Sequence, residues 1–179
     1  MTRRTRRAIA MDSLTALVAV AAVALLVRER LIPWLEDRAI VDPGDSVGSE
    51  LALIDALSGD SIRVSPDSPA VLLVFRSTCA ACDRATPVWS RVAGWAGTAV
   101  IAIGLEPAAS AGRYAKSRLP GARPAVPADP RRFARLFRIH AVPTTLVIDR
   151  GGRLASRRTG PLEESDVAEL RRRLDSSDR

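Results

Sequence analysis

The sequence has few of the side chains that bind metal ions or stack on nucleic-acid bases. Its 179 residues include two cysteines and one histidine, and aromatic residues make up only 4%. A structural zinc site is tetrahedral and takes four ligands, so this set of cysteines and histidine is too small to complete a Cys/His site. The scarcity of aromatics also predicts a core of small and branched aliphatic side chains, which Ala, Val and Leu supply.

The basic residues do not indicate a nucleic-acid partner. The net charge is +7, and Lys116 is the only lysine among 27 basic residues. Basic residues cluster at Arg131-Arg132, at Arg157-Arg158 and from Arg171 to Arg173. No aromatic side chains interleave with these clusters, as they would on a base-stacking surface. We therefore interpret the positive charge as solvated surface and expect no nucleic-acid binding.

The amino-terminal segment is an arginine-rich stretch followed by an apolar run. Residues 8–27 contain one charged side chain, Asp12, and as a helix they would extend about 30 Å, enough to cross a bilayer. We expect residues 8–30 to be a transmembrane anchor in the lipid bilayer; a cleaved signal peptide and a buried soluble helix are the alternatives. The positive-inside rule makes residues 1–7 a cytoplasmic tail. The chain would then cross the cell membrane once, with its remaining part extracytoplasmic.

The rest of the sequence predicts a linker followed by one domain. Residues 31–50 are rich in acids and glycine and lack apolar periodicity, as is typical of a linker. Within residues 51–176, the run VLLVF at 71–75 is typical of a central strand buried on both faces. Further strand-like runs alternate with helical segments, and a hairpin signal comes late in the chain. This order predicts an α/β sandwich with a mixed central sheet.

Both cysteines lie in the motif Cys79-Ala80-Ala81-Cys82, between the buried strand and an expected helix. Such a pair suits half a metal site, a structural disulfide or a redox-active dithiol. A disulfide that closes so short a loop constrains the unfolded chain little. At the start of a helix, unpaired backbone amides stabilise a thiolate on Cys79, and Cys82 lies one turn further on the same face. This position favours the redox dithiol.

With these features the sequence resembles the thioredoxin superfamily, specifically its membrane-tethered extracytoplasmic proteins of the cytochrome c maturation and methylamine dehydrogenase accessory type. The resemblance covers roughly residues 51–174. It is carried by VLLVF, CAAC, Pro87 five residues after the second cysteine, and AVPTTLVIDRGGRL at 141–154. It implies a thioredoxin-like three-layer sandwich that exchanges disulfides with a protein substrate. It also implies no cofactor or metal besides the redox-active Cys79–Cys82 disulfide, and a membrane electron donor or acceptor that resets the pair.

The resemblance also implies a role for each residue of the site. Cys79 would be the attacking thiol and Cys82 the resolving thiol. Pro143 would be the cis-proline of the family, and its loop would pack against the dithiol. Val142 and Thr144, on either side of Pro143, would bind an extended segment of the substrate.

The helix after the cysteines both matches the family and departs from it. Pro87 matches the proline that kinks this helix and supports the site. Leu73 and Ala85 stand where relatives place a carboxylate near the resolving cysteine. The nearest acid to Cys82 in the sequence is Asp83, which we interpret as a solvated surface residue.

His140 is the remaining candidate for chemistry. It lies three residues before Pro143, so it could tune the pKa of the dithiol, or it could serve only in packing. With Cys79 and Cys82 it could instead form a three-ligand copper site, which makes an extracytoplasmic copper chaperone the alternative function. Oxidant, reductant and isomerase share this scaffold, so the sequence leaves the direction of electron flow open.

Overall fold

The computed structural model describes residues 18–31, 40–47 and 51–176. The chain divides into two compact units, one ending at Ile40 and the other beginning at Val41. The first unit contains one described helix, which is α-helical over residues 18–26 and continues as the π-helix η1 (Val27–Leu31). Within the described ranges, we find no helix with both the length and the apolar character needed to cross a bilayer. Of the expected anchor and tail, residues 1–17 lie outside the described residues.

The second unit is built on a mixed sheet of seven strands in the order β2-β1-β5-β4-β3-β6-β7. The central strand β3 runs parallel to β4 and antiparallel to β6, and β4 runs parallel to β5. The carboxyl ends of β3 and β4 therefore meet the start of β6 at one edge of the sheet. The strands are β1 (Leu53–Asp55), β2 (Ser61–Ile62), β3 (Ala70–Phe75), β4 (Ala99–Gly104), β5 (Arg123–Pro127), β6 (Thr144–Ile148) and β7 (Leu154–Thr159).

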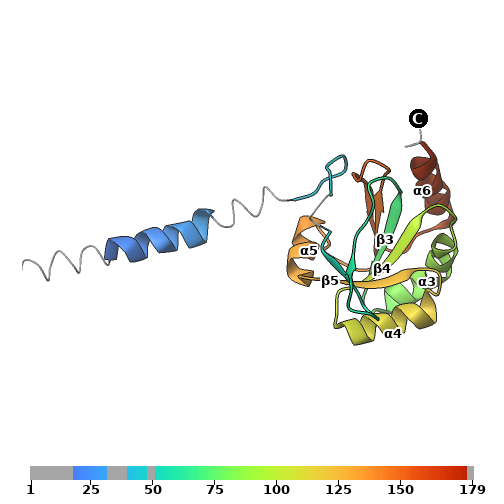
Figure 1. The fold of residues 1–179 in the computed structure, drawn as a ribbon, viewed down its shortest axis with the longest axis horizontal. Coiled ribbons are helices and arrows are strands. Elements are labelled where there is room, and N and C mark those ends of the chain that lie inside the picture. Colours follow the sequence, from blue (N-terminus) through green and yellow to red (C-terminus); the bar gives the residue numbers. More distant parts are fainter. Residues whose placement is uncertain (1–17, 32–39, 48–50, 177–179) are drawn as a thin grey trace, which may run out of the picture. The chain divides into compact units, whose positions relative to one another are not determined.

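Helices cover both faces of this sheet, which gives three layers (Figure 1). Side chains of α3, α4 and α6 share one hydrophobic cluster with alternate residues of β3, namely Val71, Leu73 and Phe75. The shorter α5 lies across the sheet from α3 and α6 (Figure 1). Because β3 is covered on both faces, all six of its residues are fully buried, and this confirms the interpretation of VLLVF. The helices are α3 (Ala80–Ala93), α4 (Ala108–Arg118), α5 (Pro130–Leu136) and α6 (Glu164–Ser176).

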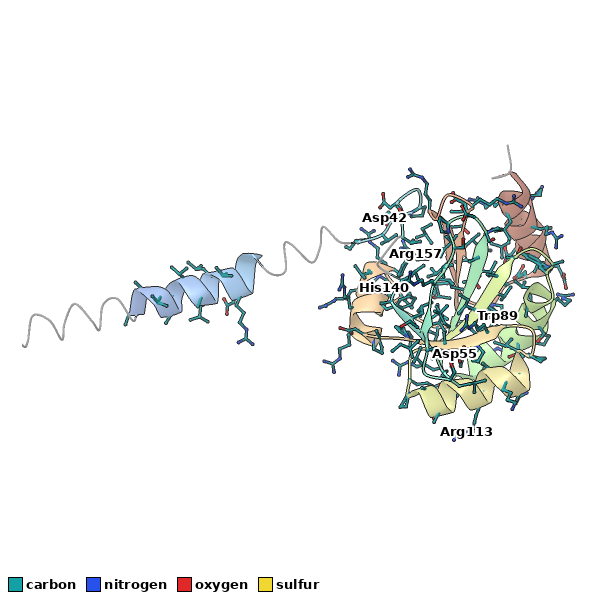
Figure 2. All side chains as sticks on the ribbon, viewed as in Figure 1. Asp42, Asp55, Trp89, Arg113, His140 and Arg157 are labelled. Carbon is teal, nitrogen blue, oxygen red and sulfur yellow. The ribbon has the colours of Figure 1, made fainter. Side chains whose placement is uncertain are left out.

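Residues 41–47, which the sequence placed in a linker, pack against the domain. Val41 and Val47 are buried, and backbone amides of this segment donate hydrogen bonds to carbonyl groups at the end of α5 and around the start of β7. Asp42 Oδ1 lies 3.7 Å from Arg157 Nη2, and the two side chains are labelled together in Figure 2. This segment is held by backbone hydrogen bonds outside regular secondary structure and by two separate buried valines. Such contacts leave no periodic apolar pattern, so the sequence did not predict that the segment packs against the domain.

Candidate active site

Cys79 caps the amino terminus of α3. Its backbone is extended, with φ of −96° and ψ of 106°, and its Sγ accepts a hydrogen bond from the backbone N of Cys82 at 3.3 Å. N-cap positions normally hold Ser, Thr, Asp or Asn, whose oxygens accept such a bond. A partly exposed sulfur in this place receives a donor that stabilises negative charge. Its position matches the one expected for an attacking thiol.

Cys82 lies in the first turn of α3 and is fully buried. The pKa of the Cys82 thiol is raised from 9.0 to about 12, mainly by burial, with contributions from its hydrogen bond with Cys79 and from the nearby negative charge of Asp83. The Cys82 thiol is therefore neutral over the physiological pH range. The two sulfurs are adjacent but unequal, since one is accessible at a helix end and the other is held protonated in the core.

This inequality predicts selective alkylation. At pH 8 we expect iodoacetamide to modify Cys79 in the folded, reduced protein, and to modify Cys82 only after unfolding in urea. The reason is that the thiolate is the reactive form, and at a pKa of about 12 Cys82 has almost none of it at pH 8. Mass spectrometry of peptides from the two samples measures the labelling. Rapid labelling of Cys82 in a folded Cys79→Ala variant would contradict the assignment.

The loop before β6 lies beside the sulfur of Cys79. The Val142–Pro143 peptide bond is cis, and Cys79 Sγ lies 3.6 Å from the carbonyl oxygen of Val142, to which it can donate. Pro143 is buried, and its carbonyl accepts a hydrogen bond from the backbone N of Gly160 at 2.8 Å. The structure thus brings Cys79 next to the Val142–Pro143 pair, which lies more than 60 residues further along the chain.

Two other predicted residues belong to the elements that carry the site, and only Thr144 of the two is buried. Thr144 is fully buried, and its hydroxyl donates to the carbonyl oxygen of Ala141 at 2.7 Å. Its side chain therefore shapes the loop from within. Pro87 lies in the interior of α3, where a proline removes one backbone donor from the helix.

His140 is exposed and lies next to α5 in Figure 2. Across the described part of the chain, no three His, Cys, Asp or Glu side chains come together closely enough to hold a metal ion. His140 therefore does not join Cys79 and Cys82 in a three-ligand group, and the geometry gives no support to the copper site.

The structure shows two side-chain contacts that the sequence did not predict, one on each side of the cysteine motif. Before it, the carboxylate of Glu106 accepts hydrogen bonds from Ser77, at 2.8 Å from the backbone N and 2.7 Å from Oγ. After it, Oδ1 of Asp83 accepts a hydrogen bond from Tyr114 Oη at 2.9 Å. Burial raises the pKa of Tyr114 to about 12, so this phenol stays a neutral donor. The available sequence signal for Glu106 was an acid two residues after β4, the strand parallel to β3.

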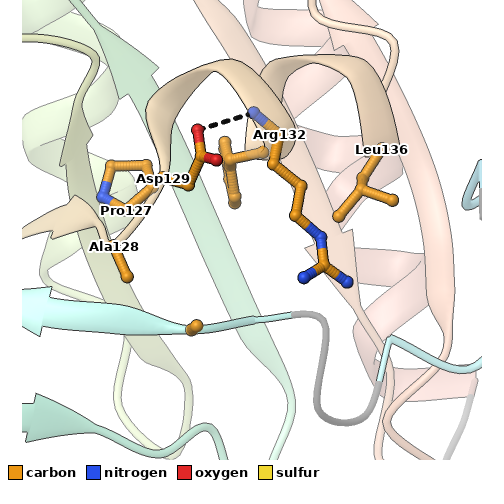
Figure 3. A pocket seen from close by; sticks show the side chains of 7 residues that line it. Pro127, Ala128, Asp129, Arg132 and Leu136 are labelled. Atoms are coloured by element: carbon orange, nitrogen blue, oxygen red, sulfur yellow. Dashed lines mark hydrogen bonds between the residues drawn. The ribbon is translucent and has the colours of Figure 1, made fainter. Parts of the chain in front are cut away.

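A pocket elsewhere on the domain contains neither cysteine (Figure 3). It lies between the end of β5 and α5, where Oδ1 of Asp129 accepts a hydrogen bond from the backbone N of Arg132 at 2.9 Å. This bond caps α5. The pocket is lined by Ala52, Pro127, Ala128, Asp129, Arg132, Phe133 and Leu136.

Comparisons with known proteins agree on the fold. No protein-family model matches the sequence, and no curated protein matches it. Among solved structures, a thio-disulfide isomerase from Thermus thermophilus is 27% identical, with a TM-score of 0.60 over 72% of this chain and 94% of that one. The thioredoxin domain of a thiol-disulfide oxidoreductase from Bacteroides vulgatus is 12% identical, with a TM-score of 0.62 over 75% and 99%. StoA from Bacillus subtilis is 13% identical, with a TM-score of 0.52 over 68% and 97%. The chain thus has a thioredoxin-like α/β fold, and its structural neighbours include a thio-disulfide isomerase and a thiol-disulfide oxidoreductase.

Proposed function

We propose that this protein is a membrane-anchored thiol–disulfide oxidoreductase that acts on protein thiols or disulfides outside the cytoplasm. One observation carries the proposal, namely the unequal pair of sulfurs at the start of α3. Cys79 Sγ is partly exposed and lies 3.3 Å from the backbone N of Cys82, whereas the thiol of Cys82 is buried with its pKa raised to about 12. Such a pair suits attack by the first sulfur and resolution by the second.

In the reducing direction the reaction takes two steps. The thiolate of Cys79 attacks one sulfur of a partner disulfide, which forms a mixed disulfide and releases the other partner sulfur as a thiolate. Cys82 then loses its proton and attacks Cys79 Sγ, which releases the second partner sulfur. The partner disulfide gains two electrons and two protons, and the Cys79–Cys82 pair becomes a disulfide. The same steps in reverse oxidise a partner dithiol.

The proton of Cys82 has to leave during the second step. Leu73 and Ala85 are apolar and fully buried, so neither position supplies a carboxylate to accept it. Asp83 is exposed, and one of its oxygens is engaged by Tyr114. We therefore assign the proton to the departing partner sulfur, which becomes basic as its bond to Cys79 breaks.

The backbone of Val142 is the site for the partner chain. Its carbonyl oxygen lies 3.6 Å from Cys79 Sγ. An extended segment hydrogen-bonded to this backbone would place its own sulfur within reach of Cys79. Main-chain pairing of this kind tolerates many sequences and takes its specificity from neighbouring side chains.

The membrane anchor is proposed for residues 8–30, with residues 1–7 on the cytoplasmic side. Support comes from the described part of the helix, where apolar side chains are exposed to solvent, among them Val20 at 69% and Leu26 at 63%. Large apolar surface of this kind is stable when lipid or another apolar surface covers it. An extracytoplasmic site needs an electron donor or acceptor in the membrane. A role in cytochrome c maturation or a related assembly pathway fits such an arrangement.

A trapping experiment tests this function. We expect the full chain with Cys82→Ala to accumulate as a mixed disulfide with its partner protein in the membrane fraction, because Cys79 can attack but no second sulfur releases the product. Non-reducing electrophoresis followed by mass spectrometry identifies the adduct. The matched control is the Cys79→Ala/Cys82→Ala double variant, which should form none. The proposal is refuted if the single variant is folded and abundant yet captures no partner.

A further inference from the structure

The loop that joins β3 to α3 carries the reactive sulfur and is tied to the neighbouring strand by one carboxylate. Glu106 is the second residue after β4 and accepts two hydrogen bonds from Ser77, one from the backbone N at 2.8 Å and one from Oγ at 2.7 Å. Both residues are partly buried. Ser77 lies two positions before Cys79, so this contact is made within the catalytic loop.

Two hydrogen bonds to one carboxylate form a stronger restraint than neutral bonds would, because an ionised acceptor makes shorter and stronger bonds. The bond to the backbone N also satisfies a donor that β3 no longer pairs once the sheet ends. Nearby, the backbone N of Leu105 donates to the carbonyl oxygen of Phe75 at 3.0 Å. Phe75, at the end of β3, and Ser77 are therefore both hydrogen-bonded to the segment Leu105–Glu106.

The restraint continues through the loop to the sulfur. The backbone N of Cys79 donates to the carbonyl oxygen of Arg76 at 3.1 Å, which closes a tight turn over residues 76–79. Ser77 lies inside this turn. The N-cap geometry of Cys79, and with it the 3.3 Å contact between its Sγ and the backbone N of Cys82, depends on where this turn sits.

We propose that Glu106 is a positioning residue, which fixes the loop over residues 76–79 so that Cys79 Sγ meets the amino terminus of α3. Its effect on turnover rests on the thiol–disulfide exchange proposed above. Glu106 acts through Ser77 and makes no contact with the substrate. The charge of Glu106 strengthens both bonds, but what the loop requires is an acceptor in the right place.

The test compares two variants that lack the same charge. Glu106→Gln keeps an amide oxygen to accept from Ser77, whereas Glu106→Ala keeps no acceptor. We expect Glu106→Gln to stay within about threefold of the wild-type kcat for exchange with a peptide disulfide, and Glu106→Ala to fall about tenfold below Glu106→Gln, with KM nearly unchanged in both. The rate at which iodoacetamide alkylates Cys79 at pH 7 should show the same order.

The controls separate this role from others. Glu169→Ala removes a partly exposed acid on α6, which pairs with Arg172 and Arg173, and should leave both rates unchanged. Equal rates for folded Glu106→Ala and Glu106→Gln would overturn the positioning role. If Glu106→Ala does not fold, Ser77→Ala, which removes only the hydroxyl, takes its place, and wild-type rates for that variant would overturn the proposal. Should the wild-type protein exchange no disulfide while Cys79 alkylation still slows in Glu106→Ala, the proposed function fails and the positioning role stands.

Discussion

Replacing Cys79 with alanine should abolish disulfide exchange, with a loss on the order of a thousandfold or more in turnover. Of the two cysteines, Cys79 is partly exposed and Cys82 is fully buried. Without Cys79, a partner disulfide would have to reach a thiol that is both inaccessible and protonated. The measurement is the rate of glutathione-linked reduction of a small peptide disulfide by the purified wild-type and variant proteins.

Two comparisons make this result specific to Cys79. Cys82→Ala should retain the first half-reaction, so a single turnover that ends in a mixed disulfide remains visible while repeated turnover stops. Ala80→Gly, in the same motif, leaves both sulfurs in place and should retain repeated turnover. Residual multiple turnover in folded Cys79→Ala would show that the chemistry occurs elsewhere.

Replacing Trp89 with alanine should destabilise the domain by about 3–5 kcal/mol, the usual cost of emptying a large aromatic site in a core. Trp89 is fully buried in the cluster between α3 and the sheet, and its Nε1 donates to Oγ1 of Thr145 at 3.2 Å. The variant leaves a cavity and an unpaired hydroxyl in β6, next to β3, the strand that precedes the cysteine motif. Urea unfolding followed by circular dichroism measures the free energy.

Trp95 provides the matched control for this substitution. It follows α3 and is half-buried, with the guanidinium of Arg171 lying 5.3 Å from the centre of its ring. Such a contact at a partly exposed site contributes about 0.5–1 kcal/mol, so Trp95→Ala should cost much less than Trp89→Ala. If both variants lost the same free energy of unfolding, Trp89 would not be the core residue that the structure makes it.

The central strand and the cysteine helix were predictable because each has a local signature. A continuous run of branched residues is stable only where both faces are covered, and β3 is fully buried as VLLVF indicated. The cysteine motif directly after it predicted sulfurs at a helix start, where the structure has Cys79 as N-cap. Mixed strand order followed from the alternation of strands and helices with a late hairpin.

The contacts on either side of the cysteines could not be predicted in the same way. Glu106 and Ser77 are 29 residues apart, and Tyr114 and Asp83 are 31 apart. Nothing in the composition around any of these residues distinguishes a bonded acid from a solvated one. Which acid meets which donor depends on how β4 and α4 are placed against β3 and α3, and this placement is set by packing of the whole core.

The segment over residues 41–47 also has a consequence for how the sheet meets other proteins. β7 is an outer strand, and Leu154 at its start exchanges backbone hydrogen bonds with Gly44 and Asp45 of that segment. At the opposite edge of the sheet, β2 has only two residues, too few to pair stably with a strand of another chain. Exposed edge strands can pair with strands of other chains, which leads to aggregation. For the disulfide exchange proposed above, edge strands that pair poorly would favour binding of a partner segment at the loop around Val142, beside Cys79, over pairing along β2 or β7.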